Sequence, residues 1–161
     1  MLNINNYTQE GFVKVYDVTE DYNGHWYYKN IDKTIMYAEH KSWVYFIVVD
    51  EEIVKIGETG NPLGIQTLTE NQPIKGTTSR LGRYRSGDGT DAYIRQELKN
   101  EVTQGRVSIW ARKCDIVQVQ TIVGGNSITS TTTLHKSLEQ DYLKHIVEHT
   151  RSLPKLNKSH K

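Results

Sequence analysis

The chain has 161 residues, of which 36% are hydrophobic, and this is enough for one domain with its own core. Its single cysteine, Cys114, excludes an intrachain disulfide, and no apolar run approaches the roughly 18 residues of a membrane span. The formal net charge is +1, and residues 1–6 do not show a signal peptide pattern. We therefore expect a folded, cytoplasmic protein without a membrane partner.

The first half of the chain predicts strands. An alternating pattern over residues 11–18 predicts the first strand, and the Asn23–Gly24 turn leads into a second strand at residues 26–28. Residues 30–40 fit either a short helix or a connecting loop. The apolar runs at residues 44–49 and 53–56, with the polar Asp50-Glu51-Glu52 between them, predict a β-hairpin over about residues 43–57.

The second half predicts helices around a further strand pair. A long polar connection covers residues 58–79. Helices are predicted over 80–85, 92–103 and 134–148, and strands over 106–112 and 116–123, followed by a loop at residues 124–127. Residues 152–161 are basic and predict a loose tail. The order indicates a single small α+β domain over residues 1–161.

The predicted hairpin carries a phenol and an ammonium group on neighbouring strands, Tyr45 and Lys55, an arrangement suited to proton transfer. Its triplets Trp43-Val44-Tyr45 and Lys55-Ile56-Gly57 resemble the two tripeptides of the GIY-YIG nuclease superfamily, which lie on adjacent strands. The first triplet keeps the tyrosine, and the second keeps isoleucine and glycine. The lysine in the second triplet is shared with a branch of restriction endonucleases that carry KIG there. The resemblance implies a GIY-YIG-like fold, a small mixed or antiparallel β-sheet flanked by helices, which agrees with the predicted order of elements.

Arg80 and Tyr84 are spaced i, i+4, so on a helix they share a face. By themselves they are also compatible with an exposed arginine beside a packed tyrosine. The resemblance implies catalytic roles for both, because the family has an arginine on the helix after the second triplet and a tyrosine or histidine one turn later. The 22 residues between Gly57 and Arg80 exceed the spacing expected for the family, which keeps Arg83 and Arg85 open as alternatives.

Glu139 borders the apolar stripe of the last predicted helix and therefore needs a partner. That partner is either a base such as His135 or a metal ion, since Mg²⁺ often takes one protein carboxylate with waters and phosphate oxygens. The resemblance implies that Glu139 is the single ligand of Mg²⁺ (or Mn²⁺). Asp141 and Glu148 face other directions on the same helix.

The positive charge is concentrated in the second half of the chain. Residues 1–71 carry five lysines and no arginine against eleven acidic residues, whereas residues 72–161 carry fifteen basic against eight acidic residues. This distribution fits a solvated surface, and beside the motif residues it favours a nucleic-acid-binding face. The predicted DNA-binding residues are Lys75, Arg83, Arg85 and Arg95.

The resemblance implies a metal-dependent, site-specific endonuclease acting on double-stranded DNA, with either Tyr45 or Lys55 as the general base. About residues 43–149 form the catalytic core, residues 1–40 an N-terminal extension available for DNA recognition, and residues 150–161 the basic tail. This compact layout indicates a restriction-type enzyme, and reading a palindrome would favour a homodimer. Segments 26–28, 66–75 and 124–133 are candidate DNA readers. The alternatives are a small homing-type nuclease from a phage or mobile element, and a non-catalytic DNA-binding module.

No nucleotide cofactor is expected. The glycine-containing segments Gly57-Glu58-Thr59-Gly60 and Gly87-Asp88-Gly89 do not continue into the Gly-Lys-Ser/Thr of a phosphate-binding loop.

Overall fold

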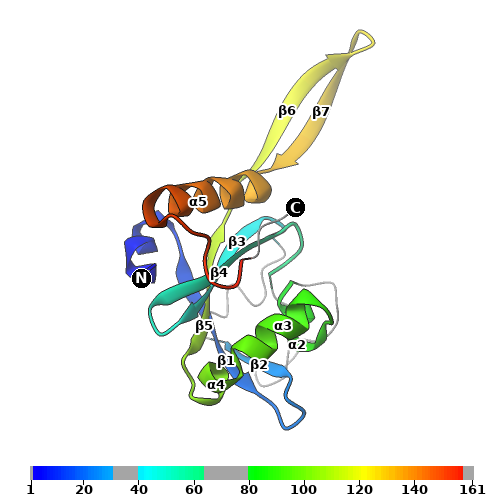
Figure 1. Ribbon diagram of the computed structural model, residues 1–161. Coiled ribbons are helices and arrows are strands. Elements are labelled where there is room, and N and C mark those ends of the chain that lie inside the picture. Colours follow the sequence, from blue (N-terminus) through cyan, green and yellow to red (C-terminus); the bar gives the residue numbers. More distant parts are fainter. Residues whose placement is uncertain (1, 31–39, 64–79, 158–161) are drawn as a thin grey trace.

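The computed structural model describes residues 2–30, 40–63 and 80–157, and the account below is confined to them. Five strands form one antiparallel sheet in the order β2-β1-β5-β3-β4, and two further strands form a separate sheet (Figure 1). The strands are β1 (Val13–Glu20), β2 (Trp26–Asn30), β3 (Trp43–Val49), β4 (Glu52–Thr59), β5 (Val107–Lys113), β6 (Ile116–Val123) and β7 (Asn126–Thr133). The helices are α2 (Arg80–Ser86), α3 (Thr90–Glu97), α4 (Lys99–Thr103) and α5 (His135–Thr150), preceded by two 3₁₀ turns, Ile4–Asn6 and Thr8–Glu10. The α+β class predicted from the sequence is confirmed.

The five-stranded sheet is buried on both faces, which explains why β3 is an uninterrupted apolar run. Tyr45 and Ile47 face a cluster completed by α2, α3 and α4, which we call the first face. Val44 and Phe46 face a cluster completed by α5 and the N-terminal turns, which we call the second face. Successive side chains of a strand point to opposite faces, so β3 is packed between two helical layers.

A hydrogen-bonded tyrosine fixes α5 to the N-terminal turns on the second face. The Tyr142 hydroxyl donates to Glu10 Oε1 at 2.7 Å and accepts from Arg112 Nη1 at 2.6 Å. Burial, together with Glu10, raises the pKa of Tyr142 well above its ordinary value, while Arg112 opposes this shift. The hydroxyl therefore stays protonated and can keep donating to the Glu10 carboxylate.

A β-bulge in the β3–β4 hairpin places Lys55 on the first face. Ile47 pairs with Lys55 and Val48 pairs with Ile53, so Val54 is an extra residue on β4. Because paired residues of antiparallel strands share a face, Lys55 and Gly57 lie on the same face as Ile47 and Tyr45.

Two predicted boundaries in the second half are wrong. The helix predicted over 92–103 is divided into α3 and α4 at Leu98, whose backbone leaves the helical range while its side chain stays buried beside Ile94 and Val102. The loop predicted at 124–127 is shorter: Gly124 and Gly125, both with positive φ angles, form the turn, and strand β7, which was not predicted, begins at Asn126 and pairs with β6. The threonines of β7 have high β-propensity, although its polar composition does not suggest a strand.

The loose tail predicted from residue 152 is also wrong for residues 152–157. Leu156 N donates to Val54 O at 2.8 Å, and both Leu156 and Asn157 are buried. The Asn157 side chain accepts from Ile56 N at 2.7 Å and donates to Ile56 O at 2.9 Å. Because β4 is at the edge of the sheet, its outer backbone groups need such partners, and the tail supplies them. Residues 158–161 lie outside the described range.

None of the helices in the described ranges is long and apolar enough to cross a membrane.

The contact between Asn157 and β4 predicts a clear stability difference between two neighbouring substitutions. Asn157→Ala removes two buried hydrogen bonds to Ile56 and should lower the free energy of unfolding by about 1–3 kcal/mol. Lys155→Ala removes only the exposed ion pair with Glu52 and should change it by less than about 1 kcal/mol. Urea unfolding of the two variants measures both values, and equal losses would contradict this role of Asn157.

Candidate active site

Two buried tyrosines meet on the first face, one from β3 and one from α2. The hydroxyl oxygens of Tyr45 and Tyr84 are 2.8 Å apart, and either can be the donor. Their rings meet edge to face, with centroids 6.0 Å apart, and Trp26 of β2 also stacks on the ring of Tyr84. Tyr45 is 1% exposed and Tyr84 is fully buried. The contact therefore joins β3, an interior strand of the sheet, to α2.

The ring of Tyr45 reaches Tyr84 because the residue opposite it on β4 is glycine. Tyr45 pairs with Gly57, and a Cβ atom at residue 57 would overlap the Cζ and hydroxyl of Tyr45. The missing side chain leaves a path for the ring across β4. The position of Tyr45, in the first triplet, thus requires a glycine at residue 57, in the second triplet.

The structure brings four of the five predicted catalytic positions to the first face or to the helix that covers it. Lys55 lies two residues before Gly57 on the same face and is 8% exposed. Arg80 is the first residue of α2, one helical turn before Tyr84. The hairpin therefore supplies a phenol and a lysine, and α2 supplies a second phenol and the backbone position of the arginine.

Hydrogen bonds from neighbouring elements hold α2 in place. The Tyr28 hydroxyl donates to Leu81 O at 2.7 Å, and Arg95 Nη1 donates to Tyr84 O at 2.8 Å. Leu81 itself is buried in the first-face cluster. The position of Tyr84 is thus determined by β2 and α3 as well as by Tyr45.

Two of the predicted DNA-binding arginines, Arg83 and Arg85, lie on α2 and the third, Arg95, lies on α3, and each has a protein partner. Arg83 Nε is 3.9 Å from Asp91 Oδ2, and Arg85 Nη2 is 3.4 Å from Asp21 Oδ2. Arg95 is occupied with the Tyr84 carbonyl. The Arg83 side chain is 58% exposed, which makes it the most accessible to a phosphate of these three. Lys75 lies outside the described residues.

Glu139 is half-buried on α5, the helix that covers the second face. His135, one turn earlier, fixes the start of this helix to the sheet: its Nε2 is 3.3 Å from Glu58 Oε2 and its Nδ1 is 3.1 Å from Ser42 Oγ. Since Glu58 follows Gly57 directly, the first turns of α5 are fixed at the end of the hairpin that contains Tyr45. The partners of His135 were missed by the sequence analysis, although strand alternation places Glu58 on the α5 side.

The carboxylate oxygens of Glu139 are suitable donor atoms for a Mg²⁺ or Mn²⁺ ion. A carboxylate is the oxygen ligand these ions prefer, and Mg²⁺ commonly combines one or two carboxylates with waters and substrate phosphates. Within the described part of the chain, no group of three or more histidine, cysteine, aspartate or glutamate residues is arranged to hold a metal.

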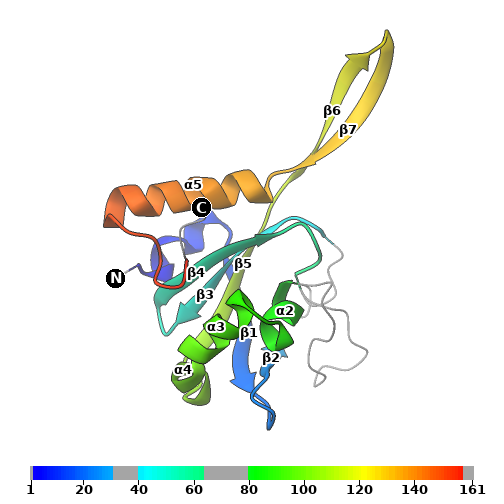
Figure 2. The same cartoon turned by 45° about the vertical axis from the view of Figure 1, so that its right-hand side comes forward.

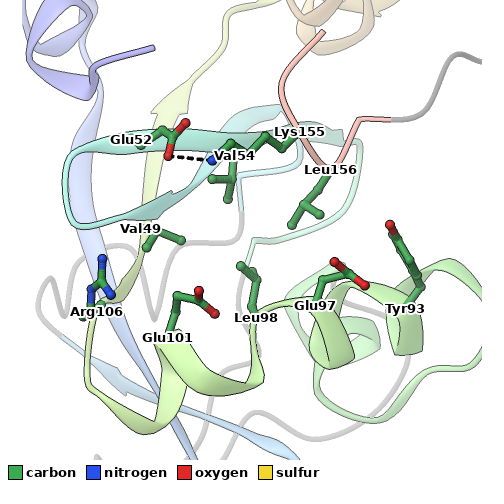
Figure 3. Close-up of a pocket in the computed structure, with 10 residues that line it drawn as sticks. All are labelled: Val49, Glu52, Val54, Tyr93, Glu97, Leu98, Glu101, Arg106, Lys155 and Leu156. Atoms are coloured by element: carbon green, nitrogen blue, oxygen red, sulfur yellow. Dashed lines mark hydrogen bonds and ion pairs between the residues drawn. The ribbon is translucent and has the colours of Figure 1, made fainter. Parts of the chain in front are cut away.

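A groove of about 310 Å³ lies at the other end of the hairpin, near the β3–β4 turn (Figure 3). Lys155 crosses one side and pairs with Glu52 at 3.2 Å. Glu97 and Glu101 stand on the opposite side, beside the apolar Leu98. Carboxylates repel phosphate, so this groove is a poor candidate for the DNA-contacting surface.

Solved structures establish the fold of the chain. No protein-family model and no curated protein matches the sequence. A mutant of EndoII from bacteriophage T4 is 19% identical with a TM-score of 0.62, and the match covers 91% of this chain and 95% of that one. The restriction endonuclease HPY188I, solved in complex with product DNA, is 16% identical with a TM-score of 0.51, with coverages of 96% and 90%. At these identities the likeness shows a shared fold, and this fold is one that a restriction endonuclease uses.

The close approach of Tyr45 to Gly57 predicts strong coupling between these two positions. Gly57→Ala alone should destabilise the protein by about 1–3 kcal/mol, because the new methyl group overlaps the Tyr45 ring. In a Tyr45→Ala background the ring is gone, and the same glycine substitution should cost less than about 1 kcal/mol. Urea unfolding of the two single variants and the double variant measures the coupling. An equal cost of Gly57→Ala in both backgrounds would show that the ring does not determine this glycine.

Proposed function

We propose that this protein is a site-specific endonuclease that hydrolyses phosphodiester bonds of double-stranded DNA with a bound divalent metal ion. The observation that carries the proposal is the 2.8 Å contact between Tyr45 and Tyr84, made across Gly57 on the face that also holds Lys55. This contact supports the resemblance to GIY-YIG nucleases, since it joins the first triplet, the second triplet and the following helix. The fold shared with a restriction endonuclease that was solved with product DNA supports the same activity.

The chemistry requires a group that removes a proton from the attacking water, and Tyr45 and Lys55 are the two candidates. If Tyr45 is the base, the ammonium of Lys55 on the same face favours its phenolate form, and the Tyr84 hydroxyl orients it. If Lys55 is the base, Tyr45 orients the water instead. In both schemes Arg80 binds the scissile phosphate from the start of α2.

Glu139 is the residue that would hold the metal ion. A bound Mg²⁺ or Mn²⁺ supplies charge neutralisation at the phosphate and at the leaving oxygen. His135 contributes by fixing the turn of α5 before Glu139 to Glu58 on β4. The ligand and the proposed base are thus carried by elements that meet at one end of the hairpin.

We further propose a restriction-type role, with recognition elements built into a compact domain. The N-terminal residues form β1 and β2 of the same sheet, which agrees with a compact enzyme lacking a tethered recognition region in the described chain. A restriction-type enzyme that reads a palindrome would act as a homodimer. A small phage-type homing nuclease is the alternative role, and a long asymmetric cleavage site would identify it.

The burial of the tyrosine pair favours a second candidate function, a non-catalytic DNA-binding module. Tyr45 is 1% exposed and Tyr84 is fully buried, so their contact also fits a purely structural bond in the core. A module of this kind would bind DNA without cutting it, and a cleavage assay separates the two functions.

The proposed endonuclease should convert supercoiled plasmid DNA to nicked or linear products with Mg²⁺ and should stop when EDTA is added. Glu139→Gln should slow cleavage by a factor on the order of 10² to 10³, because it removes the metal-binding carboxylate. Glu148→Gln, an exposed glutamate on the same helix, is the matched control and should cleave at the wild-type rate. Purified wild-type protein that binds DNA without metal-dependent cleavage would overturn the enzyme proposal in favour of the binding module.

The general base is assigned by two substitutions. If Tyr45 is the base, Tyr45→Phe should lower the single-turnover cleavage rate by a factor of about 10² to 10⁴. Near-full activity of Tyr45→Phe would exclude that scheme, and near-full activity of Lys55→Met would exclude Lys55. Tyr22→Phe is the control for loss of a phenol hydroxyl, since Tyr22 is 97% exposed at the β1–β2 turn.

A further inference from the structure

Strands β6 and β7 form an arm that projects from the body of the protein (Figures 1 and 2). Every residue of β6 is exposed, as is every residue of β7 except Thr133, which is half-buried. An isolated two-stranded hairpin is at best marginally stable in water. A partner that covers the arm would therefore stabilise it.

The register divides the arm into two unlike faces. One face carries an apolar stripe made of Val117, Val119, Val123 and Ile128, which are between 39% and 55% exposed. The opposite face carries amides and hydroxyls along its middle, with Gln118 paired to Thr131 and Gln120 paired to Thr129. Its two apolar residues, Ile116 and Ile122, lie near its two ends and are 42% and 69% exposed, so they form no continuous stripe. The apolar stripe is thus the surface that gains most from being covered.

The arm has no charged residue. None of the 39 lysine, arginine, aspartate and glutamate residues of the chain falls within residues 116–133. Protein surfaces that bind DNA are strongly positive, because phosphate contacts by lysine and arginine supply much of the affinity. Free strand edges are usually guarded by charges or proline, and residues 116–133 contain neither. A neutral partner with an apolar surface matches this composition better than a nucleic acid does.

We propose that the apolar stripe of the arm packs against the same stripe of a second copy of this chain. In a dimer with a two-fold axis, the stripe of one copy would face the same stripe of the other, so that apolar side chains meet apolar side chains. Because residues 116–133 carry no charge, no like charges would oppose each other in this contact. An eight-residue strand is about 26 Å long and two strands are about 10 Å wide, so the stripe covers roughly 260 Å² per copy. A standard interface uses about 800 Å² per partner, so the arms form a weak, concentration-dependent dimer. This inference does not depend on cleavage activity.

Sedimentation velocity of the 161-residue protein, without DNA or metal, tests the inference. The wild-type protein should shift from monomer towards dimer between about 1 and 200 μM, the range expected for a small interface. Val119→Lys places a charge in the stripe and should raise the dissociation constant at least about tenfold, which is 1.4 kcal/mol. Gln118→Lys adds the same charge on the opposite face and should sediment like the wild type. A wild-type protein that stays monomeric throughout, or equal effects of the two lysines, would overturn the proposal.

Disulfide trapping tests the same contact without disturbing the arm by a charge. Thr121 lies on the stripe face and Gln120 on the other, and the native Cys114 is buried. Thr121→Cys should form a covalent dimer under mild oxidation, whereas Gln120→Cys should remain monomeric. Equal trapping of both would contradict packing through the stripe. If the wild-type protein stays monomeric and Val119→Lys changes DNA affinity instead, the arm is a DNA-binding element and the inference is wrong.

Discussion

The structure depends on the hydrogen bond between Tyr45 and Tyr84, and this bond depends on the missing side chain at Gly57. Gly57 lets the Tyr45 ring cross the edge strand and meet a helix that follows it in the chain. This contact, together with the hydrogen bonds from Tyr28 and Arg95, holds α2 and therefore the backbone of Arg80 at the start of that helix. The absence of a side chain at Gly57 therefore allows the contact between β3 and α2 that brings the proposed catalytic residues together.

The two neighbours of Gly57 fix two other parts of the molecule. Ile56 is bound through its backbone by Asn157, which holds the C-terminal segment along the edge of β4. Glu58 pairs with His135 and thereby fixes the start of α5, which carries Glu139. Three consecutive residues therefore connect the hairpin to α2, α5 and the C-terminal segment. The arrangement of the proposed catalytic residues and the stability of the fold depend on the same contacts. Substitutions in residues 56–58 should therefore affect both the cleavage rate and the free energy of unfolding.

Local pattern was sufficient to predict the central hairpin, the short α2 and the long α5, because each has a regular apolar period or a clear turn signal. Prediction from the sequence failed where contacts between distant parts of the chain determine the structure. Nothing local to Asn157 indicates that its amide completes an edge strand about a hundred residues earlier, and the bulge that turns Lys55 to the first face depends on the partner strand. Strand β7 was missed because its hydroxyl-rich composition is shared by loops. The candidate site was predicted by its residues and their order, whereas the Gly57 contact that assembles it needed coordinates.

A double-mutant cycle on Tyr45→Phe and Tyr84→Phe tests the central claim most directly, with the free energy of unfolding and the rate of plasmid cleavage as its two readouts. The two substitutions should be coupled by about 1 kcal/mol in stability, because either one alone already breaks the bond between the hydroxyls. Their effects on the cleavage rate should likewise be less than multiplicative, since the two groups act as a unit. Additive stability losses together with independent effects on cleavage would contradict the claim that this hydrogen bond organises the site.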